Sequence, residues 1–133
     1  MAPVQSQSIS LLIVEDDVNS RDVIARLVGL KYPDYTIYTA DNGKRGLEIF
    51  KEHTPGMVIT DINMPEMDGI EMAREIKSLN TNATYIVMTA YSDKNYLEKF
   101  TEIGFCAYLM KPIDFKELFA MIDKCGSASP LEI

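Results

Sequence analysis

Short apolar runs alternate along the chain with segments in which apolar residues recur every three or four positions. The short runs are rich in β-branched and aromatic residues, which is typical of strands. They cover residues 9–14, 35–39, 57–60, 84–88 and 106–110. The wider spacing, typical of a helix with one buried face, is seen at Val23, Ile24, Leu27, Val28 and Leu30. The pattern therefore predicts five strand–helix units in strict alternation.

Strict alternation of strands and helices is typical of a parallel sheet with helices on both faces. The run 9–14 is apolar at nearly every position, as expected of a strand that is covered on both sides. A chain of 133 residues is too short for a (β/α)₈ barrel, so an open α/β sheet is predicted. We expect one domain over 9–125, a disordered lead-in over 1–8 and a linker or tail over 126–133.

Charge and hydropathy exclude several classes of function. The net charge of −7 argues against a nucleic-acid-binding surface and is compatible with a carboxylate cluster that attracts a cation. No apolar run approaches the length of a membrane span, and residues 1–10 lack the features of a secretory signal. We therefore expect a cytoplasmic protein without membrane contact.

The chain has two cysteines, Cys106 and Cys125. Their separation does not match the spacing of a metal-binding motif. Disulfides are rare in the cytoplasm, so we expect both side chains to be reduced thiols.

Polar side chains follow four of the five predicted strands, and the carboxyl ends of strands are where open α/β sheets bind ligands. These residues are Glu15, Asp16 and Asp17 after the first strand, Asp61 after the third, Thr89 after the fourth and Lys111 after the fifth. Carboxylates on neighbouring central strands raise one another's pKa and oppose ionisation. A hard divalent cation removes that penalty, and oxygen ligands of this kind suit Mg²⁺.

Lys111 and Thr89 add groups that can bind an anion beside the carboxylates. The ammonium can balance charge and then hold an oxyanion, and the hydroxyl can donate to a phosphoryl oxygen. An Asp carboxylate can itself act as a nucleophile and form an aspartyl-phosphate. Taken singly, each residue has a plainer interpretation, such as a helix cap for Asp17. Their shared position at one sheet edge favours an oxyanion site next to a metal.

Four sequence blocks are similar to those of bacterial response-regulator receiver domains, in the same order and spacing. They are LLIVEDD (11–17), VITDINMPEMDG (58–69), VMTAYSD (87–93) and AYLMKPID (107–114). The resemblance extends from about residue 9 to residue 124. It implies a CheY-like (flavodoxin-like) doubly wound sheet of five parallel strands in the order 2-1-3-4-5, with helices on both faces.

The resemblance also implies a role for each residue at the strand ends. Asp61 would accept a phosphoryl group from the phosphohistidine of a sensor histidine kinase or a phosphotransfer protein. Mg²⁺ would be bound by Asp16 and Asp61 directly, by Glu15 through water and by the backbone carbonyl of Asn63. Lys111 would pair with Asp61 and later with a phosphoryl oxygen.

The same resemblance implies a conformational switch. Thr89 would move toward the phosphoryl group, and Tyr108 would swing into the space that Thr89 vacates. Asn63 and Tyr91 would tune the lifetime of the phosphoryl group. The readout surface would comprise the last two helices and the strand between them. The peptide bond between Lys111 and Pro112 is expected to be cis.

Two alternatives to a phosphoacceptor switch remain open. A pseudo-receiver would keep the fold as a binding module without phosphorylation, although the full set of acidic, Thr and Lys residues argues against it. A Mg²⁺-dependent phosphohydrolase with an Asp nucleophile would need a second Asp where this chain has Asn63. The sequence thus favours a switch over a turnover enzyme. It leaves the output partner or effector domain unknown, and a weak homodimer through the last two helices is compatible with it.

Overall fold

The computed structural model describes residues 9–64, 66–79, 82–90 and 94–127. Its strands are β1 (Ser10–Val14), β2 (Thr36–Ala40), β3 (Met57–Asp61), β4 (Thr84–Thr89) and β5 (Ala107–Met110). Its helices are α1 (Val18–Lys31), α2 (Gly43–His53), α3 (Gly69–Lys77), α4 (Lys94–Ile103) and α5 (Phe115–Ser127). All four strand pairs are parallel, in the order β2-β1-β3-β4-β5. The predicted fold class and strand order are confirmed.

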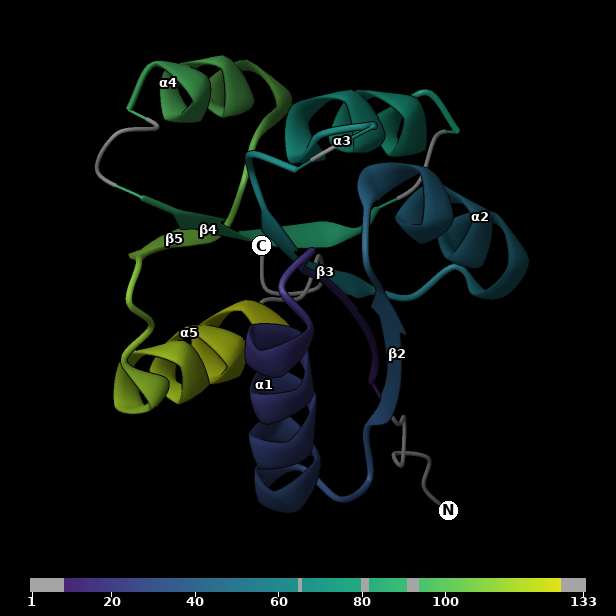
Figure 1. Ribbon diagram of the computed structural model, residues 1–133. Coiled ribbons are helices and arrows are strands. Elements are labelled where there is room, and N and C mark those ends of the chain that lie inside the picture. The colour runs from purple at the N-terminus through teal and green to yellow at the C-terminus, as the bar shows by residue number, and fades with distance from the viewer. Residues whose placement is uncertain (1–8, 65, 80–81, 91–93, 128–133) are drawn as a thin grey trace.

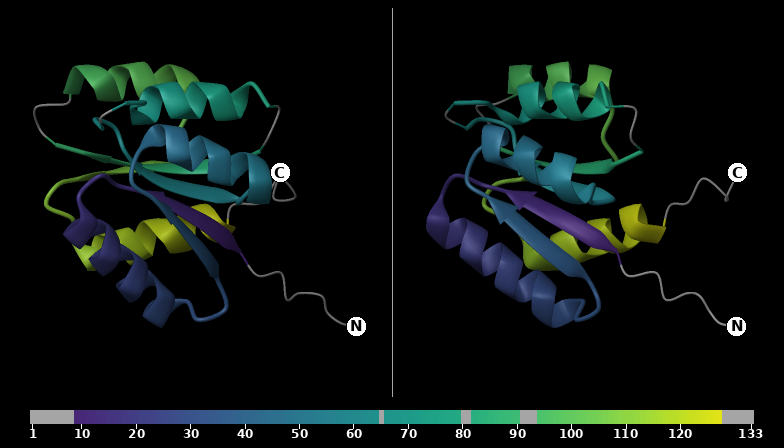
Figure 2. Two further views of the ribbon diagram at one scale, coloured as in Figure 1. Left: turned by 45° about the vertical axis from the view of Figure 1, so that its right-hand side comes forward. Right: turned by 90° about the vertical axis from the view of Figure 1, so that its right-hand side faces the viewer.

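Helices cover both faces of this sheet (Figures 1 and 2). α1 and α5 lie on one face, and α2, α3 and α4 lie on the other. Alternate residues of β1 enter two separate apolar clusters: Leu11 and Ile13 pack on the side of α1 and α5, whereas Leu12 and Val14 pack on the other side. This double burial is why β1 is apolar at every inner position. Among the described residues, no helix combines the length and the apolar character needed to cross a bilayer.

Side-chain caps place the helices that start at the carboxyl edge. The carboxylate of Asp17 accepts a hydrogen bond from the backbone N–H of Ser20, 2.8 Å away, at the start of α1. A capping box joins Asp68 and Glu71 at the start of α3. The sequence alone suggests Ser92 or Asp93 as the cap of α4, and both residues lie outside the described part of the chain. α1 and α3 therefore begin where a side chain accepts a hydrogen bond from a backbone N–H group that has no partner within the helix.

The expectation of reduced thiols is wrong. Cys106 and Cys125 form a disulfide, with their Cα atoms 6.0 Å apart. The geometry of the chain between them explains why they meet. From Cys106 along β5 the chain rises about 13 Å, and α5 returns from Phe115 to Cys125 over about 15 Å. The two paths match in length, so residues 19 positions apart meet at the amino edge of the sheet.

Element boundaries differ slightly from those expected. β1, β2 and β5 each begin one residue later than the apolar runs suggested, at Ser10, Thr36 and Ala107. α5 continues through Gly126 and Ser127, whereas the sequence predicts that a linker or tail begins at residue 126. The peptide bond between Lys111 and Pro112 is cis, as expected.

Candidate functional site

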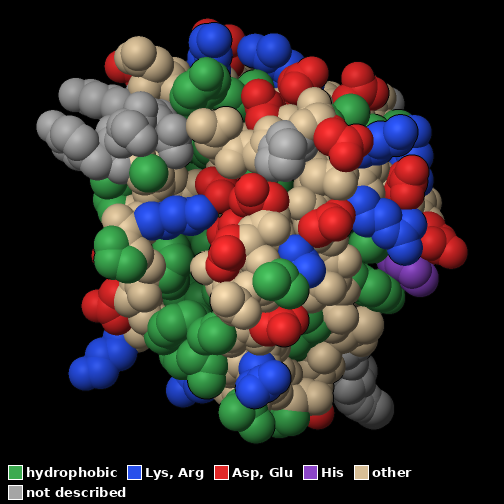
Figure 3. Space-filling model, in the orientation of Figure 1, with side chains coloured by type: hydrophobic (Ala, Val, Ile, Leu, Met, Phe, Trp, Pro, Cys, Tyr) green, Lys and Arg blue, Asp and Glu red, His purple; other side chains and the backbone are tan. Residues whose placement is uncertain are grey.

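Three carboxylates meet at the carboxyl edge of the two central strands. β1 is followed by Glu15 and Asp16, and the adjacent β3 ends at Asp61. One oxygen of each carboxylate lies within 4.8 Å of the others. Glu15 and Asp61 are almost fully buried, with 1% and 4% of their surface exposed, whereas Asp16 is open to solvent. Figure 3 shows acidic side chains gathered near the middle of the surface in view, next to a basic side chain.

Lys111 directly follows β5, which lies on the other side of β4 from the carboxylates, and its side chain reaches back to them. Its Nζ lies 2.6 Å from Oδ2 of Asp61 and 3.2 Å from Oε1 of Glu15. Thr89, at the end of β4 between them, is buried, and its hydroxyl donates a 3.1 Å hydrogen bond to the carbonyl of Ala90. Acid, hydroxyl and ammonium from four different strand ends therefore lie together at one sheet edge.

Burial shapes the electrostatics of the cluster. Desolvation raises the pKa of Asp61, and the hydrogen bond and charge of Lys111 oppose this without cancelling it. Desolvation also raises the pKa of Glu15, although the backbone N–H of Asp17 donates to its carboxylate. Desolvation alone would lower the pKa of Lys111, but its hydrogen bond to Asp61 and the nearby negative charges raise it. One ammonium thus faces three carboxylates, and the excess negative charge disfavours ionisation.

The donor set fits a hard divalent cation. Among the described residues, the buried Oε1 of Glu15 accepts no well-directed hydrogen bond, although Nζ of Lys111 is close to it. Three clustered carboxylates that share one ammonium are an arrangement that a divalent cation would stabilise. Carboxylate oxygens are ligands that suit Mg²⁺. Glu15, Asp16 and Asp61 are therefore the side chains that could hold the ion.

The loop between Asp61 and α3 packs so tightly that two positions require glycine. A Cβ at Gly69 would lie 2.4 Å from the carbonyl oxygen of Asp61, and a Cβ at Gly43 would lie 2.2 Å from that of Met67. The N–H of Gly69 donates to the carbonyl of Ile62 over 2.8 Å. These close approaches fix the backbone on which Asp61 stands.

Sequence reasoning missed Arg21, a residue of α1 that supports the site. Its guanidinium donates a 2.9 Å hydrogen bond to the backbone carbonyl of Glu15. The contact fixes the peptide that joins Glu15 to Asp16. No spacing in the sequence identifies it, because any exposed Arg on a first helical turn reads as a solvated charge.

Tyr108 and Tyr91 are the two tyrosines expected near the site. Tyr108 on β5 is 49% exposed, and its ring packs edge-on against Phe105 with the ring centroids 6.0 Å apart. It therefore lies outside the space beside Thr89. Tyr91 lies outside the described residues. Asn63 is exposed in the loop after β3, and a backbone hydrogen bond at Asn63 lowers the pKa of Asp61, against the larger effect of burial.

Comparison with known proteins assigns this architecture. A model of the response regulator receiver domain matches residues 11–123. The chain belongs to this family. Receiver domains are the switches of two-component signalling rather than turnover enzymes, and they pair with histidine kinases and output domains. The family as a whole is phosphorylated and binds Mg²⁺, in agreement with the acidic cluster.

Two curated relatives illustrate where such a receiver domain occurs. The transcriptional regulatory protein ZraR of Escherichia coli (strain K12) is 35% identical over 117 residues, which cover 88% of this chain and 26% of ZraR. Sporulation initiation phosphotransferase F of Bacillus subtilis (strain 168) is 30% identical over 114 residues, covering 86% of this chain and 90% of that protein. The receiver domain thus spans about a quarter of the first relative and most of the second.

Solved structures agree with this assignment. The N-terminal domain of WS1339 from Wolinella succinogenes is 32% identical, with a TM-score of 0.84 over 90% of this chain and 94% of that one. A LuxR-family DNA-binding response regulator from Staphylococcus aureus is also 32% identical, with a TM-score of 0.82 over 90% of this chain and 99% of that one. The fold is therefore shared over about nine tenths of this chain.

Proposed function

We propose that this receiver domain is a Mg²⁺-dependent phosphoacceptor switch in which Asp61 takes a phosphoryl group from a phosphohistidine. The observation that carries the proposal is the 2.6 Å contact between Lys111 and Asp61 beside two further acids. A nucleophilic carboxylate next to a cation site and an ammonium is suited to accept a phosphoryl group. The donor would be a sensor histidine kinase or a phosphotransfer protein.

Each residue has a distinct task in this proposal. Asp16, Asp61 and the backbone carbonyl of Asn63 would hold Mg²⁺, with Glu15 contacting it through water. The bound ion supplies positive charge that offsets the excess of carboxylates. An oxygen of Asp61 attacks phosphorus as the bond from phosphorus to the histidine nitrogen breaks. Lys111 keeps Asp61 ionised beforehand and afterwards pairs with a phosphoryl oxygen.

Thr89 and Tyr108 would convert this chemistry into a signal. The phosphoryl group adds negative charge that the hydroxyl of Thr89 can hydrogen-bond if it leaves its present partner. The buried space beside Thr89 could then admit the ring of Tyr108, which is now exposed. Phosphorylation shifts the population only by its differential affinity for the two arrangements. Asn63 and Tyr91 would set the lifetime of the phosphoryl group.

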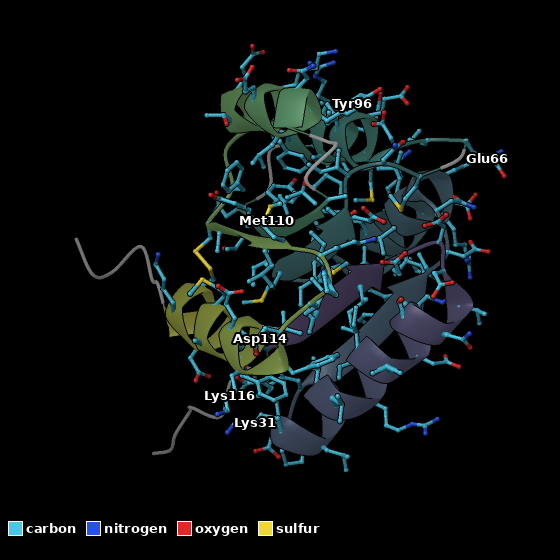
Figure 4. All side chains as sticks on the ribbon, turned by 60° about the vertical axis from the view of Figure 1, so that its left-hand side comes forward. Lys31, Glu66, Tyr96, Met110, Asp114 and Lys116 are labelled. Atoms are coloured by element: carbon cyan, nitrogen blue, oxygen red, sulfur yellow. A yellow bond between two sulfur atoms is a disulfide. The ribbon has the colours of Figure 1, made fainter. Side chains whose placement is uncertain are left out.

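The changed surface would be the one formed by α4, β5 and α5. Tyr96 and Met110 are exposed there, 39% and 40% respectively, together with Tyr108 (Figure 4). An output domain, a separate partner or a second copy of the chain could bind this surface. We place the domain in the cytoplasm, where a histidine kinase has access to ATP, and we expect it to bind neither nucleic acid nor membrane directly.

A pseudo-receiver is the second candidate, because the family fold alone does not require phosphorylation. The crowding of Glu15, Asp16 and Asp61 argues for the switch, because a module without a cation would leave one ammonium facing three carboxylates. A phosphohydrolase is less well supported, because Asn63 stands where a general acid would be needed. Steady turnover of a phosphoester would favour it.

Intact-mass spectrometry after incubation with acetyl phosphate tests the proposal. We expect one phosphoryl adduct that requires Mg²⁺, is absent in Asp61→Asn and persists in Asp22→Asn, a matched change at an exposed position of α1. No adduct on the wild-type chain, under conditions that label another receiver domain, would replace the switch by the pseudo-receiver. An adduct that survives Asp61→Asn would assign the acceptor to another residue.

A further inference from the structure

The disulfide between Cys106 and Cys125 lies at the opposite edge of the sheet from Asp61. Cys106 directly precedes β5, and Cys125 lies in the last turns of α5. The bond therefore ties the start of the strand to the end of the helix that follows it, as the joined sulfur atoms in Figure 4 show. The link lies within the α4–β5–α5 region, away from the carboxylates.

The two cysteine residues differ in how far they are buried. Cys125 is 2% exposed and packs in the apolar cluster with Leu118 and Ile122. Cys106 is only partly buried, and it lines a hollow of about 320 Å³ with Gly104 and Phe105. Cys125 also borders a hollow, but almost all of its surface is covered. An incoming thiolate therefore meets Cys106 first.

The bond closes a covalent ring that contains β5 and the residue that follows it. Residues 106–125 form this ring, and Lys111 and Tyr108 lie inside it. Lys111 is held at the carboxyl edge by Asp61, 2.6 Å away. The segment from β5 to α5 is thus fixed at one end by an ion pair and at the other by the disulfide.

Contacts other than the disulfide hold α5 along its length. Leu118 and Ile122 are fully buried against the sheet. The hydroxyl of Tyr32 donates to the carbonyl of Phe119 and to the carboxylate of Asp123, at 3.1 and 2.7 Å. α5 should therefore stay docked when the disulfide opens, while its last turns gain freedom.

We propose that the Cys106–Cys125 pair is a thiol–disulfide exchange site for a dithiol reductant, and that its redox state sets how firmly the end of α5 is held to β5. A reductant thiolate attacks Sγ of Cys106, the bond to Sγ of Cys125 breaks, and Cys125 leaves as a thiolate. The second thiol of the reductant then attacks the mixed disulfide and releases Cys106. Two electrons and two protons pass to the protein, and the reductant becomes a disulfide.

A redox-sensing role suits a disulfide in the cytoplasm, where we place this domain. Disulfides of cytoplasmic proteins are usually transient or redox-sensing rather than permanent. A pair with one partly exposed cysteine, which joins β5 to α5, suits that use. The effect on signalling rests on the proposed function, because it needs the phosphoryl group to act through Lys111 and Tyr108. The exchange chemistry and the loosening of α5 do not.

Two measurements on the intact chain test the site. Glutathione, a monothiol, followed by an acid quench that stops the released Cys125 thiolate from closing the bond again, should leave a mixed disulfide that peptide mapping locates at Cys106. Hydrogen–deuterium exchange should then compare oxidised protein with protein treated with dithiothreitol. We expect exchange in the last turns of α5 to become about tenfold faster on reduction, with little change in β1 and β3.

The control is the double variant Cys106→Ser with Cys125→Ala, which should exchange like reduced wild type and ignore dithiothreitol. If that variant does not fold, Cys106→Ser alone, which keeps Cys125 in the core, takes its place. Equal exchange in the oxidised and reduced protein would overturn the proposal. So would rapid alkylation of both cysteines in protein never exposed to a reductant, or trapping at Cys125.

The phosphorylation assay separates this inference from the proposed function. If acetyl phosphate labels the chain, we expect the rate of adduct formation to differ at least about twofold between the oxidised and reduced forms. An equal rate would remove the link to signalling. A chain that is never labelled would defeat the proposed function, while the result of the exchange experiment would still decide the redox site.

Discussion

At the carboxyl edge of the sheet, Asp61 and Glu15 are buried as charged groups beside Lys111, whereas at the amino edge Cys106 and Cys125 join β5 to α5 covalently. Burial raises the pKa of both carboxyl groups, which means that the ionised site is less favourable inside the protein than in water. The disulfide acts in the other direction, because closing a loop restricts the unfolded chain.

The contrast shows how one small domain can hold a reactive site. The unfavourable interactions between charges are confined to the ends of β1, β3 and β5. The opposite edge of the sheet contributes stability through the disulfide and apolar contacts. Changes at the two edges should therefore shift the free energy of unfolding in opposite directions.

Removal of the disulfide should have the largest effect. Cys106→Ser combined with Cys125→Ala should lower the free energy of unfolding by about 3 kcal/mol, as expected for a loop of this length. Urea denaturation followed by circular dichroism measures this, and wild type in excess dithiothreitol should match the variant. A loss below about 1 kcal/mol would show that the bond constrains the unfolded chain little.

Mg²⁺ should stabilise the carboxyl edge by a comparable amount. At about a hundredfold excess over its dissociation constant, one bound ion raises the free energy of unfolding by about 2.7 kcal/mol. Thermal denaturation with and without the ion measures this. The gain should fall sharply in Asp61→Asn and remain in Asp22→Asn. An equal gain in all three proteins would place the ion elsewhere.

Asp61→Asn without Mg²⁺ should stabilise the protein by about 1 kcal/mol at neutral pH, because it removes one of three clustered carboxylates. Lys111 keeps Glu15 as a partner, 3.2 Å away. The measurement is urea denaturation at several pH values. A variant less stable than wild type at neutral pH would contradict the idea that the cluster is electrostatically unfavourable.

The pH dependence of this gain follows from the raised pKa of Asp61. When a folded-state pKa lies above the unfolded one, the stabilising contribution is complete below the unfolded pKa and is lost as the pH rises through the folded pKa. Wild type therefore carries its full penalty only at pH values above the raised pKa of Asp61. The advantage of Asp61→Asn should shrink as the pH falls through the raised pKa, which lies above the ordinary carboxyl value of about 4.

Tyr32→Phe should give the smallest change, a loss of about 0.5 to 1 kcal/mol. The substitution removes the hydroxyl that bridges α1 to Phe119 and Asp123 of α5 while keeping the ring stacked on Tyr35. Denaturation in urea measures the loss. Val23→Ala, at an exposed position of the same helix, serves as the control and should change little. Equal effects of the two substitutions would show that the bridge adds nothing.

Sequence periodicity was enough to predict the elements of this fold, because the three central strands bury residues on both faces and most of the helices have one apolar side. The positions of Asp61 and Lys111 at the ends of strands were sufficient to predict a shared edge. The disulfide was not predictable from spacing, since it depends on the matched lengths of β5 and α5. The role of Arg21 was equally hidden, because a contact to a backbone carbonyl leaves no signature in side-chain pattern.

The tight packing at Gly69 has a consequence for genetics. A methyl group there would lie 2.4 Å from the carbonyl oxygen of Asp61. Every other amino acid at this position must therefore displace the backbone of Asp61 or the start of α3. A screen for alleles that abolish signalling should therefore recover substitutions at codon 69 alongside those at codon 61. Such alleles would mimic loss of the acceptor, although residue 69 contributes no side chain to the chemistry.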